Sequence, residues 1–556
     1  MKKNSFVEGS LIATLAIVVS KVMGILYVIP FYAVIGTLGS SLYSYAYNIY
    51  VIFLNISSAG IPVAISKLVS EYDSKEMKEA KVRSFKLGVI VVSILSIICF
   101  LLLIVFAKEI VLFIIGNKSG GNTLEDIILV IRVIAFSVLI IPFLSVSRGY
   151  LQGHKYISSS SFSQVIEQIV RIAVVLIGSY ITIKVLEQKV ALGVGVALGG
   201  SFIGGLVAIG YVLKKIFNNK EQLDLDKELK KDDISNKEIF KKILIYSIPF
   251  IIINVTVNFF NIVDMTLIIR TLGSLGFSGE QAEFVASAMT TWGYKLNMIV
   301  NAIATGLTIS LIPNLVSAYT LKKTNVVNKI FNQALQIVLY VSVPAAVGLS
   351  FLSAPVWNIF YGVSDLGPII FRFSILTAIF CNIYLISIQT AQSINAFKTV
   401  CIAVVLGFSM NAIWDVPFMH LCNYLGLPAF YGATLATILG YIVAIGIVLY
   451  KLIKYEGIRL KESIKTFGKI LISVICMVLV LSLLKLVYPY VYENRFMSII
   501  YVAVYALVGG SVYLFITHKF GLIKGIFEAK TINRLVSKLT FGKVKLKGED
   551  NDTKED

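Results

Sequence analysis

The sequence predicts an all-α integral membrane protein with about fourteen transmembrane helices. Hydrophobic residues make up 57% of its 556 residues, and the mean hydropathy of +0.84 is far above that of a globular domain. Apolar stretches recur from Leu11 to Thr517, each long enough to cross a bilayer, which takes roughly 20 helical residues. Strands of a membrane barrel would instead alternate apolar and polar residues over about ten positions. Since only helices and closed barrels satisfy their backbone groups in lipid, these continuous stretches are helices.

The predicted spans follow one another through short connections, with one long polar break after the sixth. The seventh and eighth are longer than a bilayer requires, so we expect them to tilt or to carry polar ends. The spans lie at residues 10–35, 41–69, 87–107, 124–147, 158–183, 191–213, 243–272, 281–319, 328–352, 366–391, 396–420, 428–450, 466–487 and 496–517.

Basic residues are distributed unevenly between the two sides of these spans. The formal charge of +19 would suggest nucleic-acid binding in a soluble protein, but in a membrane protein excess Lys and Arg mark cytoplasmic loops. We therefore predict a multi-pass protein of the bacterial plasma membrane, with both termini cytoplasmic and no nucleic-acid partner. The loops on the opposite side hold six of the 50 basic residues: Lys108, Lys118, Lys184, Lys189, Arg270 and Arg495.

The polar break at residues 214–242 divides the chain into two halves that partly repeat. Thr-Leu-Gly-Ser occurs at 37–40 and again at 271–274, and two further short matches follow in the same order. Two six-helix lobes related by a pseudo-two-fold axis along the membrane normal are a known transporter plan. The predicted organisation is an N-terminal lobe at 1–216, a cytoplasmic linker at 217–242, a C-terminal lobe at 243–452, two further helices at 453–518, and a cytoplasmic tail at 519–556.

Ionisable residues in the middle of predicted spans are candidates for function, because burying a charge in a membrane is costly. Lys21 and Lys295 lie near the middle of the first and eighth spans, and the fifth span carries Glu167 and Arg171 on one helical face. The excess of cations predicts a central cavity for an anionic cargo, above all a phosphate or pyrophosphate group. A structural Glu167–Arg171 pair that locks the helix is the alternative for those two residues.

Polar stripes on the seventh and eighth spans predict that both face the same wet cavity. Asn258 and Asn261 share a face with Asp264, and Asn301 lies on the polar face of the next span. Asp264 and Glu167 are further candidates for ion coupling or gating. The alternative is that these side chains only join neighbouring helices by hydrogen bonds.

Enzyme and metal signatures are absent from the sequence. The three histidines and five cysteines have no metal-ligand spacing, and no P-loop, nucleophile elbow or HExxH motif occurs. We expect no catalytic residue, no metal and no cofactor, with the membrane potential or a coupling cation as the energy source.

Several stretches of the first half carry a family resemblance: residues 20–33 (SKVMGILYVIPFYA), 42–47 (LYSYAY), 58–62 (SAGIP), 148–154 (RGYLQGH) and 163–171 (SQVIEQIVR). They resemble the polysaccharide-transport branch of the MOP exporter superfamily, including the Gram-positive MurJ-type lipid II flippases and the stage V sporulation protein B group. The resemblance implies two six-helix lobes around a cationic cavity, a groove for a lipid tail on the last two helices, and an undecaprenyl-pyrophosphate-linked sugar as cargo. The Arg that Gram-negative members have in helix 1 and helix 8 is replaced by Lys21 and, nearby, Lys295, while a second helix-1 Arg is replaced by Tyr27.

Together these observations favour a flippase that moves a polyprenyl-pyrophosphate-linked cell-wall precursor, with lipid II as the first choice, between leaflets by alternating access. Its partners would be that lipid-linked glycan, membrane lipids and the cell-wall synthesis machinery. The alternatives are a flippase for another polyprenyl-linked oligosaccharide or spore-cortex precursor, a cation-coupled multidrug exporter, and, from another class, a membrane glycan polymerase or ligase or a cell-wall scaffold. The net positive interior disfavours cationic drugs, and the short outward loops disfavour a polymerase.

Overall fold

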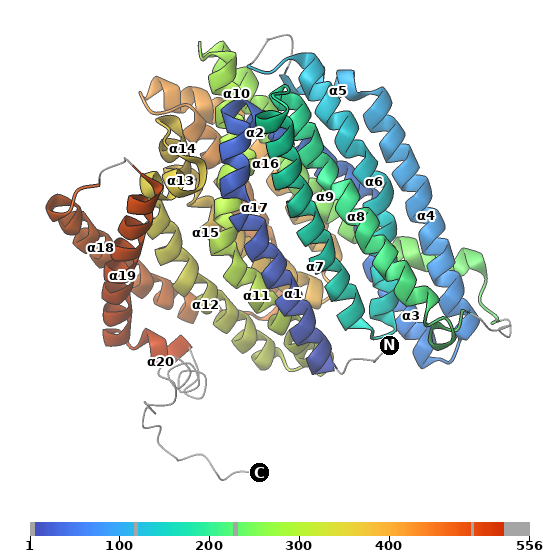
Figure 1. Ribbon diagram of the computed structural model, residues 1–556. Helices are drawn as coiled ribbons and strands as arrows, with labels where there is room; N and C mark the ends of the chain where they lie inside the picture. The colour runs from blue at the N-terminus through green and yellow to red at the C-terminus, as the bar shows by residue number, and fades with distance from the viewer. Residues whose placement is uncertain (1–5, 116–120, 226–231, 491–493, 527–556) are drawn as a thin grey trace, which may run out of the picture.

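The computed structural model describes residues 6–115, 121–225, 232–490 and 494–526, and this part of the chain is helical throughout (Figure 1). Each of the fourteen predicted spans lies on one or more of its helices. The helices are α1 (Phe6–Leu26), α2 (Val28–Ser58), α3 (Ile61–Ser74), α4 (Lys78–Val105), α5 (Ala107–Ile115), α6 (Leu124–Gly153), α7 (Ile157–Ala173), α8 (Val190–Phe217), α9 (Asn236–Ser274), α10 (Gly279–Ser287), α11 (Gly293–Thr320), α12 (Thr324–Phe351), α13 (Ser353–Tyr361), α14 (Leu366–Ser374), α15 (Thr377–Ser393), α16 (Phe397–Tyr424), α17 (Phe430–Glu456), α18 (Lys461–Val487), α19 (Arg495–Lys519) and α20 (Leu522–Ile526).

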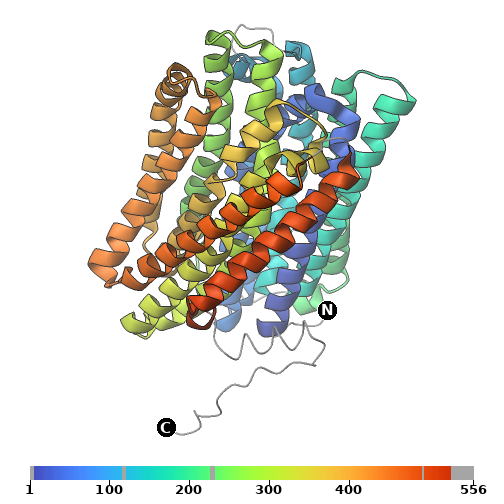
Figure 2. The same ribbon diagram turned by 90° about the vertical axis from the view of Figure 1, so that its left-hand side faces the viewer.

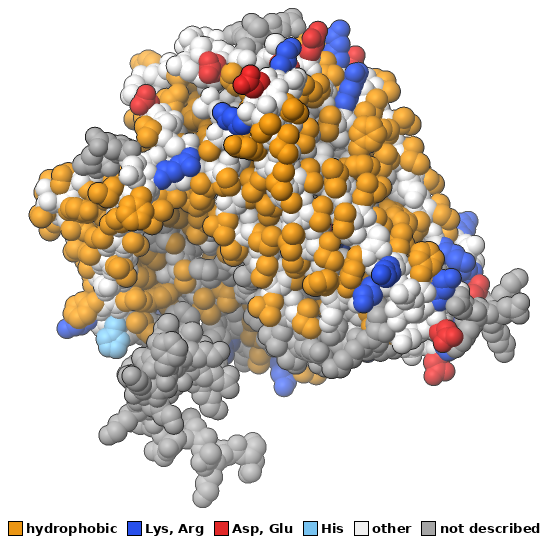
Figure 3. Space-filling view, viewed as in Figure 1, with side chains coloured by type: hydrophobic (Ala, Val, Ile, Leu, Met, Phe, Trp, Pro, Cys, Tyr) orange, Lys and Arg blue, Asp and Glu red, His pale blue; other side chains and the backbone are white. Residues whose placement is uncertain are grey.

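The length and composition of these helices are those of a multi-pass membrane protein. Among the described residues, 12 helical segments are long and apolar enough to cross a membrane. The helices α1 and α11, at the places of the first and eighth predicted spans, are additional to those 12. Apolar side chains cover the middle of the face in Figure 3, while charged side chains gather towards its upper and lower rims. This pattern matches a bilayer with polar surfaces on both sides.

The first two predicted spans are joined by a sharp turn rather than by a loop. Gly36 has φ 66° and ψ −167°, a conformation that glycine adopts readily and other residues avoid. The ring of Tyr43, after the turn, lies 5.4 Å from that of Phe31, before it. The chain therefore doubles back inside α2, so the first span comprises α1 and the start of α2.

Two of the predicted spans contain wider, π-helical turns. In the fifth span, α7 passes into π-helix at Val174–Gly178 and again at Ile181–Val185. In the eighth, the π-helical segment η4 (Ala288–Trp292) joins α10 to α11. Such turns are rare in helices and are frequent at functional sites. Here they adjoin Arg171 and Lys295.

Helices of each half pack mainly on neighbours from the same half. In the first, α6 packs against α2, α4 and α8; in the second, α16 packs against α17 and α9. The hairpin of α18 and α19 lies at one edge of the bundle, against α12 and α13 (Figures 1 and 2). The exact division into lobes, linker and tail stays a prediction. We call the end of the bundle where α1 begins the N-terminal end, and the opposite end, where α10 begins, the far end (Figure 1).

The segment that joins the two halves is fastened to the N-terminal end of the first half. Lys81, which is 2% exposed, lies 2.8 Å from the Asp73 carboxylate and 2.7 Å from that of Asp224, which follows α8. His154 is buried nearby, and burial lowers its pKa to about 4, so this side chain adds no charge at neutral pH. Asp224, after α8, is therefore anchored to α4.

Replacement of Lys81 by Ala should destabilise the protein, because it removes the ammonium group that lies 2.7 Å from the nearly buried Asp224 carboxylate. We expect a loss of about 3 kcal/mol, measured as a lower melting temperature of the purified protein in detergent. Lys75→Ala is the matched control, since the exposed Lys75–Glu71 pair contributes little. Equal melting temperatures for the two variants would contradict this assignment.

Candidate functional site

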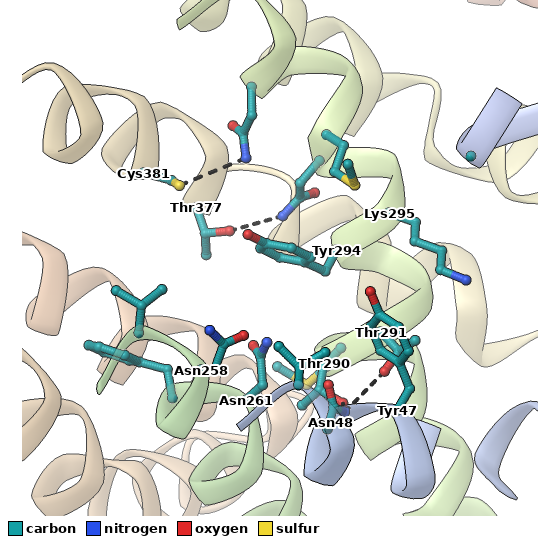
Figure 4. A pocket seen from close by; sticks show the side chains of 18 of the residues that line it. Tyr47, Asn48, Asn258, Asn261, Thr290, Thr291, Tyr294, Lys295, Thr377 and Cys381 are labelled. Atoms are coloured by element: carbon teal, nitrogen blue, oxygen red, sulfur yellow. Dashed lines mark hydrogen bonds between the residues drawn. The ribbon is translucent and has the colours of Figure 1, made fainter. Parts of the chain in front are cut away.

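A cavity of about 390 Å³ lies between the two halves of the chain. The first half lines it from α1, α2 and α7, and the second half from α9, η4, α11, α14, α15 and α17. Figure 4 shows polar side chains from both halves, among them Asn48, Asn258, Asn261 and Lys295. A polar cavity at the junction of two halves is where alternating-access transporters bind their cargo.

The three predicted cations Lys21, Arg171 and Lys295 all line this cavity, although they come from three different helices. The Lys295 ammonium lies over three aromatic rings, at 4.2 Å from the Trp292 ring centroid, 4.8 Å from that of Tyr43 and 5.4 Å from that of Tyr27. Cation–π contacts of this kind are strongest where water is excluded. Lys295 is thus accommodated by rings rather than by a carboxylate.

Arg171 lies near tyrosines of the same aromatic cluster. Its guanidinium interacts electrostatically with Tyr27, Tyr43, Tyr47 and Tyr50. A tyrosine oxygen accepts a hydrogen bond without neutralising the cation. The cavity therefore keeps the positive charge of Arg171.

Glu167 does not accompany Arg171 in the cavity. Its carboxylate accepts from Arg148 of α6 at 2.8 Å, and the Arg148 Nε donates to the Ser163 hydroxyl at 2.7 Å. Both members of the pair are largely buried. Glu167, which was expected beside Arg171, is thus bound to α6 instead. Among the described residues, the acid that lines the cavity is Asp264.

The two polar stripes predicted from the sequence meet across the cavity. Asn258 and Asn261 line it from α9, and Asn301 lines it from α11, where its amide donates towards the Cys381 sulfur at 3.8 Å. Amides both donate and accept, as the hydroxyl and acetamido groups of sugars do.

Several lining residues were missed by the sequence reasoning. Gln164 and Gln168 line the cavity two turns and one turn before Arg171, and this helical spacing could have been recognised in the sequence. Asn48 of α2 donates to Thr290 at 3.3 Å and to Thr291 at 3.1 Å in η4. That contact between the halves had no local signal.

Asp264 belongs to a buried group of oxygen atoms that includes an acid missed from the sequence, Asp415 of α16. Thr437 donates to Asp264 Oδ2 at 3.2 Å, and Asn411 donates to Thr437 at 3.2 Å. Asp415 is fully buried and acts electrostatically on Asp264. In the described part of the chain, Asp264 Oδ1, Asn411 Oδ1 and both Asp415 carboxylate oxygens have no hydrogen-bond partner. Acceptor oxygens gathered without donors are the ligands of a hard cation, or of protons.

The fold, with its cavity between two membrane-embedded halves, defines the class of protein as a multi-pass membrane transporter rather than an enzyme. Residues 6–319 match the family described as "Polysaccharide biosynthesis protein", so the chain belongs to this family. It is 29% identical over 538 residues to the "Lipid II flippase MurJ" of Bacillus subtilis, covering 94% of this chain and 97% of the relative. It is 25% identical over 364 residues to "Stage V sporulation protein B" of the same organism, covering 66% and 68%.

Solved structures show the same fold. A lipid II flippase MurJ in an inward closed conformation superposes with a TM-score of 0.67 at 20% identity, covering 92% of this chain and 98% of that one. An inward-facing multidrug resistance MATE family transporter of the MOP superfamily superposes with a TM-score of 0.60 at 17% identity, covering 77% and 93%. The predicted MurJ- and MATE-like fold is confirmed, and the glycan polymerase or ligase alternative is set aside because these families are transporters.

The Arg148–Glu167 pair should behave as a structural unit. Arg148→Met leaves a buried carboxylate without its partner, so we expect a loss of about 3 kcal/mol or more, seen as a lower melting temperature. The double variant Arg148→Met/Glu167→Met removes both charges and should recover most of the stability. A double variant as unstable as the single one would show that the two charges do not act on each other.

Proposed function

We propose that this protein is a flippase that moves a polyprenyl-pyrophosphate-linked cell-wall precursor, with lipid II as the first choice, from the inner to the outer leaflet by alternating access. The observation that carries the proposal is the charge of the cavity. Among the described residues, Lys21, Arg171 and Lys295 line it against one acid, Asp264, whose carboxylate already accepts from Thr437. A pyrophosphate diester brings complementary negative charge. The 29% identity to a lipid II flippase supports the choice of cargo.

Each cation has a distinct role in this proposal. Lys21 and Lys295 hold the pyrophosphate from the first and second halves, and Arg171 is a third contact. The amides of Asn258, Asn261 and Asn301 accommodate the sugar. The polyprenyl tail stays in lipid, along a groove on the last two helices. Lysines give point charges without the planar fork of arginine, so the site is less selective for geometry.

The direction of transport follows from the predicted topology. The basic loops lie on the side of the N-terminal end, so that end is assigned to the cytoplasm and the far end to the outside. The lobes at 1–216 and 243–452 would rock about the cavity to expose the head group at either end.

We assign ion coupling to Asp264 together with Asp415, and not to Glu167, whose carboxylate is held by Arg148. The four buried acceptor oxygens of Asp264, Asp415 and Asn411 would take a monovalent cation or protons. Binding there neutralises charge inside the second half, so its free energy would bias the two access states differently.

A flippase for another polyprenyl-linked oligosaccharide or spore-cortex precursor uses the same site, and the similarity to stage V sporulation protein B keeps it as the second candidate. A multidrug exporter shares the fold, but three cations in the cavity disfavour cationic drugs. A cell-wall scaffold protein that transports nothing would not require a charged cavity.

Removal of either lysine should abolish transport while the protein still folds. In cells depleted of the native protein, Lys21→Ala and Lys295→Ala should leave lipid II on the cytoplasmic side, as measured by its accessibility to an external reagent. Arginine at either position should retain part of the activity, because it keeps the charge.

Lys485→Ala is the matched control, since Lys485 lies in a span but over the Phe351 ring, outside the cavity. Normal lipid II export by either cavity variant would contradict the proposal. Loss of export for a different lipid-linked glycan alone would identify the second candidate.

The acid pair predicts a specific ion effect on stability. Sodium ions should raise the melting temperature of the purified protein relative to choline at equal ionic strength, because a ligand that binds the folded state stabilises it. Asp264→Asn and Asp415→Asn should remove this shift, whereas Asp365→Asn, at an exposed position outside the cavity, should keep it. A sodium shift that survives in both acid-pair variants would contradict the assignment; a shift with pH alone would identify protons as the ions.

A further inference from the structure

At the far end, the two halves of the chain are held together by a set of direct contacts between α2 and the segment of α10 and η4. The Ser41 hydroxyl donates to the Ser287 hydroxyl at 3.4 Å, and the Trp292 indole donates to the Ser40 carbonyl at 3.1 Å. Figure 1 shows α10 and α2 at the end of the bundle opposite the N-terminus. We call this set of contacts the far gate, because it lies beyond the cavity wall formed by Asn48, Thr290 and Thr291.

The far gate contains a buried carboxyl group, that of Glu283 in α10, which is 3% exposed. Its partner comes from the other half: the Asn122 amide donates to Glu283 Oε2 at 2.7 Å and to the Leu38 carbonyl at 3.3 Å. Gly121 packs against Glu280 and Leu38, so the segment before α6 fits closely between α2 and α10. Glu283 thus lies inside a contact that must break if the far end opens.

The remaining groups around Glu283 suit a neutral carboxylic acid better than a carboxylate. Within the described residues, Glu283 Oε1 and the Tyr45 hydroxyl are buried and interact with each other, and neither atom has any other hydrogen-bond partner. The titratable groups that act on Glu283 most strongly are Tyr45, from α2, and Glu280, from its own helix. Neither is a cation. An ionised Glu283 would therefore be buried without a counter-charge, which is costly, whereas a protonated Oε1 has the Tyr45 oxygen to donate to.

We propose that Glu283 is a proton-binding site that latches the far gate. The carboxyl group holds a proton while α2 and α10 are in contact. When the gate opens, water reaches the carboxyl group and the O–H proton passes to that water, leaving a solvated carboxylate. Closing reverses the step. This inference rests on the proposed alternating access but not on the nature of the cargo, and it adds a proton step at a position separate from the Asp264–Asp415 pair.

The chain carries its own reporter for opening of this gate, because the free thiol of Cys381 lines the cavity. In a variant with Cys99, Cys401, Cys422 and Cys476 replaced by Ala, a membrane-impermeant methanethiosulfonate added to intact cells should reach Cys381 only through an open far end. Labelling should rise several-fold between about pH 5.5 and about pH 8, across the range in which a buried carboxyl group can titrate. Thiol reactivity itself changes with pH, so rates are divided by those of a Tyr424→Cys, Cys381→Ala protein, whose reporter position is 87% exposed.

Glu283→Gln keeps the shape and a donor but cannot lose a proton, so it should hold labelling at the low, acidic level at every pH. Glu125→Gln, at an exposed position near the start of α6 that does not act on Glu283, should keep the wild-type profile. A Glu283→Gln protein that follows the wild-type profile, or that labels strongly at all pH values, would overturn the proposal, as would a wild type without pH dependence. None of these results bears on which lipid is carried, which the lipid II assay decides separately.

Asn122→Asp provides a second test that does not depend on the folding of the Gln variant. It places another carboxyl group 2.7 Å from Glu283 across the gate, so repulsion between two carboxylates should raise labelling above wild type at alkaline pH and leave it unchanged at acidic pH. Equal labelling at both pH values would count against a proton at this site.

Discussion

The cost of placing a charge inside a membrane shapes the whole interior of this protein. The charges are accommodated in different ways, and the difference separates structural from functional groups. Arg148 and Glu167 neutralise each other in a hydrogen-bonded pair, which suits a fixed part of the first half. Lys295 and Arg171 are surrounded by aromatic rings and hydroxyls that leave their charge unneutralised. An uncompensated charge is stable there only if a group of opposite charge binds in the cavity or if water solvates the charge.

Ionisable side chains occupy three separate positions in the molecule, and each position suits a different species. The cations in the cavity would suit the proposed anionic cargo, and the oxygens around Asp264 and Asp415 would suit a cation or protons. Glu283 lies at the far gate. An ion or ligand shifts a conformational equilibrium only by its difference in affinity for the two states. Glu283 lies in a contact between the halves, so opening of the far end would change its surroundings directly. The oxygens around Asp264 all belong to the second half, so opening would affect them only through rearrangement within that half.

The sequence was sufficient for the helices and for the three cavity cations, because each depends on local information: a continuous apolar run, or one charge within it. It was insufficient wherever a partner lies far along the chain. Glu167 is four residues from Arg171, yet it binds Arg148, since helix packing rather than spacing decides which side chains meet. The turn at Gly36 and the π-helical segments beside Arg171 and Lys295 were also not predicted. Hydropathy is averaged over a whole span, so it does not reveal an altered backbone conformation at single residues. Asp415 is different: an acid within an apolar run was visible and was overlooked.

The surroundings of Lys295 connect cargo binding with movement. Lys295 and Trp292 belong to the second half, whereas Tyr27 and Tyr43 belong to the first, so two of the three rings around the ammonium are contacts between halves. If the halves separate, the ammonium loses those rings and needs another partner. An anionic head group supplies one, and would stabilise the separated state more than the closed one. Without cargo, the separated state would leave Lys295 in contact with Trp292 alone. The cation–π contacts with Tyr27 and Tyr43 would therefore stabilise the closed state when the cavity is empty and disfavour opening without cargo.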